Sequence, residues 1–250
     1  DSNGNGFFMG IYDDSQKAYL YANQGSISVF SDDAVPINSW MHIACTINET
    51  DDESNMYING VLQTTTGTAS GFSCSTVVAT IIGRTAYENS RYWNGELADV
   101  RFYDTVLELA DIQVLASKIN IDSALGPGTD NLVSWWKLNE GTGTDANDSA
   151  GTNDGAIYDG GSLGATWEFD AFSVNVQDGD DTTTDGTFDV SQGKLECLGL
   201  SSANFDGSDD YIAIGNYETT MQGSHTWSLW FKATDGRTGT GQMLIGTTDA

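Results

Sequence analysis

One stretch in the middle of the chain, residues 96–116, constrains the fold more than any other part of the sequence. Val100 and Phe102 alternate with polar or amphipathic residues at 99, 101 and 103, which predicts a strand with one buried face. Asp104 interrupts the alternation, and its carboxylate can accept the free N–H groups at the start of a helix. We therefore expect a half-buried strand followed by a short helix that Asp104 caps.

The helix expected after this strand carries an apolar stripe. Leu107, Ile112 and Leu115 recur at spacings of five and three residues, so they share one face of the helix. A half-buried strand followed by a helix that clamps the sheet often ends a β-sandwich. In this chain the same pattern lies near the middle of the sequence.

The rest of the chain is typical of short strands separated by turns. Its 250 residues include 29 glycines and only 2 prolines, which suits tight turns, and they could form one large all-β domain or two small ones. Alternating or β-branched runs predict strands at 7–12, 18–22, 27–30, 40–47, 56–58, 61–63, 77–82, 132–138, 211–214, 227–232 and 243–245. Residues 77–82 are almost continuously β-branched, so we expect them to be buried.

The order of several motifs resembles laminin-G-like domains, which are concanavalin A-like jelly rolls. The motifs that resemble the closing part of such a domain are Trp-Met-His-Ile-Ala at 40–44, Met-Tyr-Ile-Asn-Gly at 56–60, Ile-Gly-Arg at 82–84, Tyr-Trp-Asn-Gly at 92–95 and Asp-Val-Arg-Phe-Tyr-Asp at 99–104. The opening pattern of the family follows only later, at 132–157, 203–215 and 225–233. The resemblance implies an all-β fold, a two-sheet antiparallel jelly-roll sandwich.

The motifs therefore occur in permuted order. Residues 1–121 resemble the C-terminal half of a laminin-G-like domain, and residues 131–250 resemble the N-terminal half. Residues 122–130, which contain Gly-Pro-Gly, are the best linker in the chain. The two halves form one permuted domain, or they belong to successive domains of a tandem array in which adjacent copies complete each other. We favour the array.

The two arrangements differ in what they predict for the core. An array predicts few core contacts between the two halves of one chain. A single permuted domain predicts that Trp40, Ile82 and Val100 pack against Trp135, Phe205 and Leu229. In both cases residues 7–12 should pair with the strand that contains Ile245, because an open strand edge exposes unpaired N–H and C=O groups.

No pattern in the sequence indicates catalysis. The superfamily that the chain resembles includes glycan hydrolases, whose glucanases carry a Glu-x-Asp-x-x-Glu motif on one strand, and this motif is missing. Glu96 and Asp99 are three residues apart, which places them on opposite faces of a regular strand. His42 and His225 have no nucleophile at a recognisable spacing. We therefore expect no enzyme activity and no catalytic residues.

A calcium ion is the cofactor that the sequence favours. One irregular loop supplies the oxygen-bearing side chains that hard cations prefer, and these are Asp145, Asp148, Asn153 and Asp154. The loop resembles the Asp-Ser-x-Gly-x-x-x-Gly loop that lies near a structural calcium ion in many of these domains, beside the strand that carries Asp99. Many family members have two acids where this chain has Ala98-Asp99. We predict a structural ion held by Asp148, Asn153, Asp154 and Asp99, and the alternative is a hydrogen-bonded loop without an ion.

The charge of the chain excludes some partners and favours others. Asp and Glu total 36 against 9 Lys and Arg, which gives a net charge of −27. Nucleic acids and anionic membranes are repelled by such a field, because both are bound through Lys and Arg. The sequence has no apolar run of 18 residues, so no membrane insertion is expected. A solvated acidic surface or a few cation sites would account for the charge.

Other residues suggest possible surface or covalent chemistry. Tyr92 and Trp93 precede a turn and are the best candidates for stacking against a sugar, although they could equally pack at the rim of the core. Cys45 shares the parity of its apolar strand neighbours and should be a buried thiol, whereas Cys74 and Cys197 could form a disulfide. Two sequons begin at positions 48 and 147.

These observations lead to one prediction of function with an alternative from another class. We expect a non-catalytic extracellular repeat module in an adhesive or structural protein of a cell or virion surface, with other copies of the same domain as partners. The alternative is a lectin-type module that binds a glycan, including one that accompanies a polysaccharide-degrading enzyme. An exposed aromatic side chain beside polar groups would favour the lectin, and a large contact between copies would favour the structural module.

Overall fold

The structure of this protein is a computed structural model. It describes residues 6–12, 14–22, 27–70, 72, 77–85, 90–117, 129–159, 162–163, 166–169, 201–215, 221, 223–234 and 241–249. Cys74 and Cys197, the candidate disulfide pair, lie outside this part of the chain, as do residues 170–200. No helix in the described ranges is long and apolar enough to cross a membrane.

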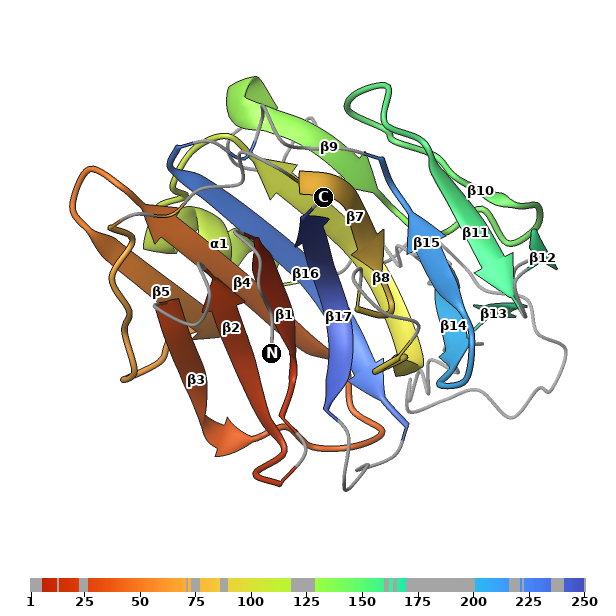
Figure 1. Cartoon of the computed structure of the whole chain (residues 1–250), viewed down its shortest axis with the longest axis horizontal. Helices are drawn as coiled ribbons and strands as arrows, with labels where there is room; N and C mark the ends of the chain where they lie inside the picture. The colour runs from red at the N-terminus through yellow and green to blue at the C-terminus, as the bar shows by residue number, and fades with distance from the viewer. Residues whose placement is uncertain are drawn as a thin grey trace, which may run out of the picture.

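The described strands form two antiparallel sheets that face each other as a sandwich (Figure 1). One sheet has nine strands. Its order is β10(Asp145–Ala146), β11(Gly155–Asp159), β15(Tyr211–Ala213), β7(Val77–Ile82), β17(Gln242–Asp249), β1(Phe7–Ile11), β2(Lys17–Ala22) and β3(Ile27–Ala34), and β12(Ser162–Leu163) pairs with β11. This sheet lies nearest the viewer in Figure 1.

The second sheet has eight strands. Its order is β13(Thr166–Phe169), β14(Ser201–Asp206), β8(Asn94–Tyr103), β16(His225–Ala233), β4(Met41–Asn48), β5(Glu53–Ile58) and β6(Val61–Leu62), and β9(Leu132–Trp136) pairs with β8. A short 3-10 helix, η2(Thr129–Asn131), precedes β9. The two antiparallel sheets confirm the predicted all-β jelly-roll sandwich.

The core lies between the two sheets and follows the alternation of the sequence. Alternate residues of β1 and β2 point inward, which buries Met9 and Leu20 with Cys45 of the opposite sheet. The Cys45 thiol is therefore buried, as predicted, and burial raises its pKa far above the usual range for a thiol. Ile81 and Ile82 of the central strand β7 are also buried, as the continuous β-branched run predicts.

β8 contains an irregularity that the alternation of the sequence does not reveal. Its pairing with β16 shifts register between Ser228 and Trp230, and Asp99, opposite this point, has a positive φ of 55°. Leu97 and Val100 both face the core although they are three residues apart. The prediction that Glu96 and Asp99 lie on opposite faces is therefore wrong, because a β-bulge changes the face on which residues after it point.

The only α-helix among the described residues, α1(Leu109–Leu115), follows β8 as expected. Its N-cap is Glu108, whose side chain makes no capping hydrogen bond, so the prediction that Asp104 caps the helix is wrong. Four residues separate Asp104 from the first residue of the helix, and the last of them, Glu108, is extended. Leu107 precedes the helix, so the predicted stripe is only partly helical. Leu107 nevertheless packs with Ile112 and Leu115 in one apolar cluster on the outer face of the eight-stranded sheet.

The two halves of the chain share one core. β1 pairs with β17 through Phe8 opposite Gly246 and Met9 opposite Ile245, so residues 7–11 fill the strand edge as predicted. Ile82, Val100, Phe205 and Leu229 belong to the same hydrophobic cluster. Trp40 and Trp135 are not part of this cluster, and Trp135 instead contacts Asp99 and Arg101. The division of the chain into the two parts of a permuted domain remains a prediction.

Candidate functional site

Asp99 lies in a buried group of charged and aromatic side chains on the outer face of the eight-stranded sheet. Its Oδ1 accepts hydrogen bonds from Arg101 Nε at 2.7 Å and from the indole N–H of Trp135 at 2.6 Å. The Arg101 guanidinium also lies 4.2 Å from the centre of the Trp135 ring. Charge-assisted hydrogen bonds and a cation–π contact therefore hold Asp99 in place.

Asp148 organises the loop between β10 and β11. Its Oδ1 accepts hydrogen bonds from the backbone N–H groups of Trp135, Ala150 and Gly151, at 2.8, 3.1 and 2.9 Å, and its Oδ2 accepts from the N–H of Asn153 at 3.1 Å. Burial opposes ionisation of Asp148, but these donors outweigh it and lower the pKa of its carboxyl group. The carboxylate thus replaces the backbone partners that an irregular loop lacks.

The four residues predicted to hold calcium are brought together in part. Asp154 Oδ1 accepts the backbone N–H of Asp148 at 2.8 Å, and Asn153 Nδ2 donates to Ser134 at 2.9 Å. Asp99 is linked to this loop through Trp135, whose indole and backbone N–H groups donate to Asp99 and Asp148 respectively. An ion at this loop would have to share the Asp148 oxygens with these donors. The loop site remains a prediction.

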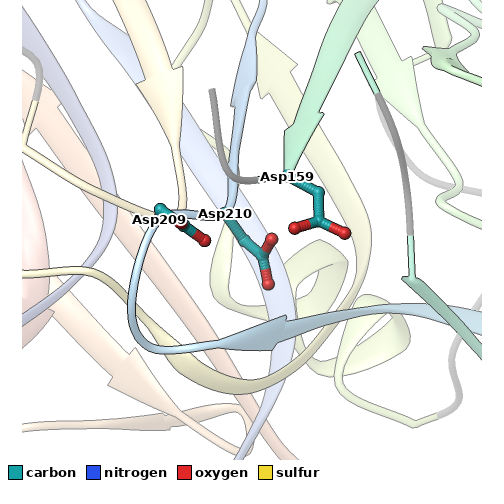
Figure 2. Close-up of side chains that lie close together, drawn as sticks. All are labelled: Asp159, Asp209 and Asp210. Atoms are coloured by element: carbon teal, nitrogen blue, oxygen red, sulfur yellow. The ribbon is translucent and has the colours of Figure 1, made fainter. Parts of the chain in front are cut away.

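A different group of carboxylates gathers at one end of the nine-stranded sheet. Ligand oxygens of Asp159, Asp209 and Asp210 all lie within 4.8 Å of one another. Figure 2 shows the three side chains at the end of β11 and in the turn before β15. Burial, together with the nearby negative charges of Asp206, Asp159 and Asp209, raises the pKa of Asp210 to about 6, although a backbone hydrogen bond from Asp206 lowers it.

This acidic cluster fits a cation better than the predicted loop does. An ion about 2.3–2.6 Å from each oxygen can reach ligand atoms up to about 5 Å apart, which matches the spacing of the three carboxylates. Sequence reasoning did not single out these residues. The Asp-Asp pair at 209–210 was visible in a motif, but only the fold shows that Asp159 lies beside it.

The two aromatic residues predicted to stack on a sugar have different environments. Trp93 is fully buried and packs against Phe231 with ring centres 5.8 Å apart. Its faces are therefore covered, and the prediction that it stacks on a ligand gives way to the alternative of core packing. Tyr92 is half-buried.

A second set of aromatic residues, which we call the outer aromatic cluster, lies on the outward face of β1–β3 and the turn after β1. Its members are Tyr12, Tyr19, Tyr21 and Phe30. Tyr12 is 38% exposed and meets the rings of Tyr19 and Phe30 edge-on, at 6.0 and 5.8 Å. The sequence signal was available, because tyrosines alternate with core-facing Ala and Leu along β2 and make both faces of that strand apolar.

A smaller aromatic stack lies near the acidic cluster. Tyr158 of β11 and Tyr211 of β15 are directly opposite each other, with ring planes 8° apart and centres separated by 4.6 Å. The Arg84 guanidinium lies 4.0 Å from the centre of the Tyr211 ring. Since Ile157 and Ile212 face the core, the two tyrosines lie on the outward face of the sheet.

Glu96 and His42, two described groups that could act as an acid or a base, are buried and engaged with other protein groups. Glu96 accepts hydrogen bonds from Lys232 and Ser202, both at 2.7 Å. His42 Nε2 lies 2.8 Å from the Ser228 hydroxyl, but both side chains are buried, and burial with the nearby charge of Arg101 lowers the pKa of His42 to about 3. This serine–histidine contact therefore lies in the protein interior and is out of reach of a substrate.

The two sequons lie in described turns. Asn48 Oδ1 accepts the backbone N–H groups of Thr50 and Asp51, so its side chain organises the turn between β4 and β5. Asn147 is exposed, and its Nδ2 donates to Glu140 at 3.3 Å. The Asn147 side chain is thus the more accessible of the two.

Comparison with known proteins agrees with the fold. Residues 1–113 match the family model for the concanavalin A-like lectin/glucanases superfamily. The two facing antiparallel sheets are those of the concanavalin A-like fold. Comparison with curated proteins finds no match to the chain. The superfamily name covers proteins that bind glycans and proteins that hydrolyse them.

Proposed function

We propose that the chain is a non-catalytic laminin-G-like module that works outside the cell, as part of an adhesive or structural assembly on a cell or virion surface. The superfamily supports a binding module in general. The observation that carries the assembly role is an exposed apolar edge at the end of the eight-stranded sheet. There Val61 and Leu62 of β6 are 62% and 46% exposed.

The position of β6 favours contact with another copy. Among the described strands β6 pairs only with β5, so a partner strand could pair along its second edge. The Val61 carbonyl accepts a hydrogen bond from Gln63 Nε2 at 2.9 Å. α1 lies beside the turn before β6, because a Cβ at Gly60 would meet Gln113 and Ala116. α1 adds Leu109 and Val114 to the exposed apolar residues. Clustered exposed apolar side chains mark interaction surfaces more often than isolated ones do.

Sedimentation velocity at physiological salt tests this contact. We expect the intact protein to self-associate at high concentration, and a Val61→Lys/Leu62→Lys variant to associate at least about tenfold more weakly. Ile37→Lys is the matched control, because Ile37 is 48% exposed but lies outside this edge. A protein that stays monomeric throughout, or an equal effect of both variants, would remove the assembly proposal.

The engaged carboxylates support the non-catalytic part of the proposal. A retaining glycoside hydrolase needs two carboxyl groups about 5–5.5 Å apart that both reach the scissile bond. Along β8, Glu96 is held by Lys232 and Asp99 by Arg101. The Asp99–Arg101 pair is fully buried and the Glu96–Lys232 pair is largely buried. Freeing either carboxylate for catalysis would therefore break a buried ion pair.

We also propose, as a second candidate, that the protein binds a glycan, alone or beside a polysaccharide-degrading enzyme. The outer aromatic cluster favours it, because sugar rings present C–H faces that pack on aromatic rings. Retention on immobilised neutral polysaccharides should fall when Tyr21→Ala and Phe30→Ala are combined, and Tyr158→Ala should serve as the control. Equal retention of all variants would exclude this face.

Calcium binding is the cofactor proposal, with the acidic cluster as the site that fits best. Bound calcium would neutralise the repulsion among Asp159, Asp209 and Asp210 and raise the melting temperature. Isothermal titration of the intact protein with calcium should show a site that Asp159→Asn weakens and Asp148→Asn leaves unchanged. If Asp148→Asn weakens calcium binding and Asp159→Asn does not, the ion belongs to the predicted loop. If the intact protein shows no heat of binding when calcium is added, calcium binding is excluded.

A further inference from the structure

A tight turn decides which backbone groups of β6 face its free edge. Asn59 and Gly60 form this turn between β5 and β6, and both have a positive φ, of 49° and 76°, as a two-residue hairpin turn requires. In such a hairpin the residues that flank the turn, Ile58 and Val61, bond to each other through both backbone groups. The next residue, Leu62, then belongs to a pair without hydrogen bonds.

The Leu62 backbone therefore points away from β5. The residue after it, Gln63, donates its N–H to the Met56 carbonyl at 2.9 Å. Hydrogen-bonded and non-bonded pairs alternate along an antiparallel ladder, so the N–H and C=O of Leu62 face the open edge. The chain then leaves β5, and Thr64 N–H donates to Asp32 Oδ1 of the other sheet at 3.0 Å. At Leu62 the edge thus offers a partner strand one donor and one acceptor.

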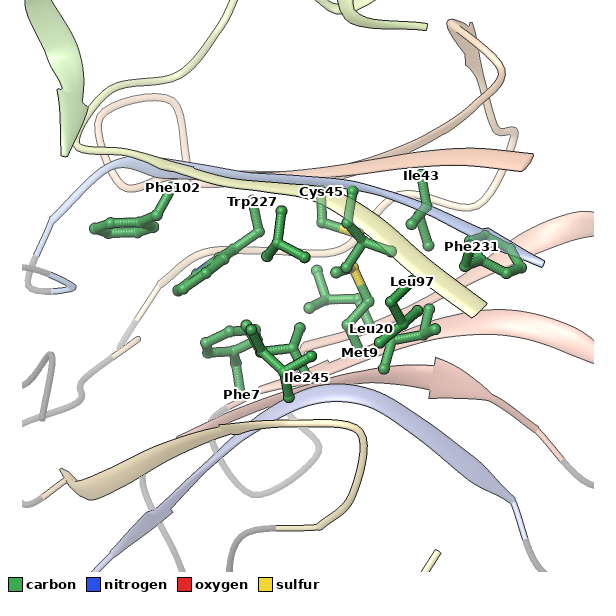
Figure 3. Close-up of a cluster of buried hydrophobic side chains, with 14 of the residues drawn as sticks. Phe7, Met9, Leu20, Ile43, Cys45, Leu97, Phe102, Trp227, Phe231 and Ile245 are labelled. Carbon is green, nitrogen blue, oxygen red and sulfur yellow. The ribbon is translucent and has the colours of Figure 1, made fainter. Parts of the chain in front are cut away.

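Apolar side chains flank this edge on both faces of the sheet. Ile43 points into the core in Figure 3, and Ile58, opposite it on β5, packs against the same core. Val61 is opposite Ile58 on β6 but lies past the core and is 62% exposed. Leu62, the next residue, faces the other side of the sheet and is 46% exposed.

α1 extends the apolar surface on the outer face of the sheet. A Cβ at Gly60 would lie 3.2 Å from Gln113 Cγ and 3.3 Å from Ala116 Cβ, so these two residues face the turn before β6. Leu109 precedes them by four and seven residues, and therefore lies on the same side of the helix. Leu109 is 46% exposed. Leu62 and Leu109 thus form one apolar surface beside the turn.

Acidic side chains border this surface, and β4, β5, β6 and α1 contain no Lys or Arg. Burial, together with the nearby negative charges of Glu53 and Glu108, raises the pKa of the Tyr57 hydroxyl. Both carboxylates therefore lie near Tyr57, which is directly opposite Leu62. An apolar edge with an acidic border is complementary to a strand that carries apolar and basic side chains.

We propose that the β6 edge binds an extended segment of another protein, in which a few apolar residues are flanked by Lys or Arg. The backbone of the segment pairs with the N–H and C=O of Leu62, its apolar side chains cover Val61, Leu62 and Leu109, and its basic side chains approach the acidic border. Two backbone hydrogen bonds hold a strand weakly, so the charges should contribute much of the affinity and make it depend on salt.

This inference uses the edge that the proposed function assigns to contact between copies, and it names a tighter occupant. A second copy would bring the same acidic border to the edge, and like charges repel most strongly at low salt. A basic segment has the opposite charge and should displace a second copy. The chemistry of the edge therefore favours a partner with a different sequence.

Fluorescence anisotropy with labelled peptides tests the kind of partner. The probe is the capped peptide Thr-Lys-Val-Leu-Val-Lys-Thr, and one control peptide has Glu in place of Lys. A second control keeps the lysines but carries an N-methyl group on the central leucine, which removes the donor that would bond to the Leu62 carbonyl. We expect the probe to bind the intact protein at least about tenfold more tightly than either control. Equal binding of the probe and either control, or no binding of the probe, would overturn the proposal.

Variants of the intact protein locate the binding, at about 0.1 M salt, where charges more than about 10 Å apart are largely screened. Leu62→Pro removes the donor at the edge and no bond to β5, so the fold should persist while the probe binds at least about fivefold more weakly.

The acidic border has its own pair of variants. Glu53→Gln/Glu108→Gln should weaken binding of the probe at least about fourfold. Asp130→Asn/Asp145→Asn is the matched control, because it removes two exposed charges in η2 and β10, away from β6, and should change the affinity by less than about 1.5-fold. Equal effects of these two double variants would mean that the probe binds elsewhere on the acidic surface, contrary to the proposal.

Sedimentation velocity separates this inference from contact between copies. A protein that stays monomeric but binds the probe through Leu62 would remove the contact between copies and support the basic segment. A self-associated protein should dissociate when the probe is added. If its sedimentation does not change at a saturating concentration of the probe, the segment does not occupy the β6 edge and the inference is wrong.

Discussion

At the scale of single residues, Asp148 shows how one carboxylate can replace regular structure. Four backbone N–H groups donate to it, and they come from the edge of β9 and from the loop itself. The sequence indicated the residue and its loop. It did not indicate the role, because hydrogen bonds and metal coordination use the same carboxylate oxygens and the same Asp- and Asn-rich patterns.

Replacing Asp148 separates these roles. Asp148→Asn removes the charge and one acceptor, so we expect the free energy of unfolding at pH 7 to fall by about 2–3 kcal/mol. Because the folded-state pKa of Asp148 is lowered, this contribution should be present above pH 4 and be lost as the pH falls further. Asp145→Asn is the control, since Asp145 is exposed and accepts only a 3.5 Å contact from Thr144. A loss below about 0.5 kcal/mol in urea unfolding would mean that the loop does not depend on Asp148.

The two buried histidines make stability depend on pH. Burial lowers the pKa of His42 to about 3 and that of His225 to about 4, from 6.5 in the unfolded chain. Below pH 6.5 the unfolded state therefore binds more protons, and the free energy of unfolding should fall with slopes up to about 1.4 kcal/mol per pH unit for each histidine. Asp210 opposes this loss, because its raised pKa favours the folded state as the pH falls from 6 towards 4.

Urea unfolding at pH 7, 6 and 5 measures the balance. We expect lower stability at pH 5 than at pH 7, and a steeper loss in Asp210→Asn, which lacks the opposing titration. Equal stability at both pH values in that variant would contradict the burial of neutral histidines.

At the scale of elements, β8 shows where sequence patterns succeed and where they stop. The alternation of residues 99–103 predicted which side chains face the core, and Val100 and Phe102 do so. The bulge at Asp99 was not predictable, since it depends on the register with β16 and β9, which come from the other half of the chain. The same limit applies to the acidic cluster, which needs β11 beside β15.

The pairing of β1 with β17 can be tested by one added methyl group. A Cβ at Gly10 would meet the backbone oxygen of Gln242 across the irregular point of this pair. Gly10→Ala should therefore lower the free energy of unfolding by about 1–3 kcal/mol. Ser28→Ala, on the edge strand β3, should change it by less than about 0.5 kcal/mol. If both variants unfold at the same urea concentration as the wild type, the two strands do not pair as described.

At the scale of the whole molecule, the order of motifs predicted a sandwich made from two halves but did not decide which copy completes which half. The reason is physical, because a strand edge is satisfied equally well by its own chain and by another chain with the same sequence. In the described structure both halves contribute side chains to one core. The division into residues 1–121 and 131–250 of a permuted domain remains a proposal.

The central claim is that this concanavalin A-like sandwich binds without catalysing. The most direct measurement is the release of reducing ends when the intact protein is incubated with a panel of β-glucans and galactans. We predict no release above the blank, because Glu96 and Asp99 are held in buried pairs with Lys232 and Arg101. Release that disappears in Glu96→Gln or Asp99→Asn, while the folded state persists, would show that the protein is a hydrolase.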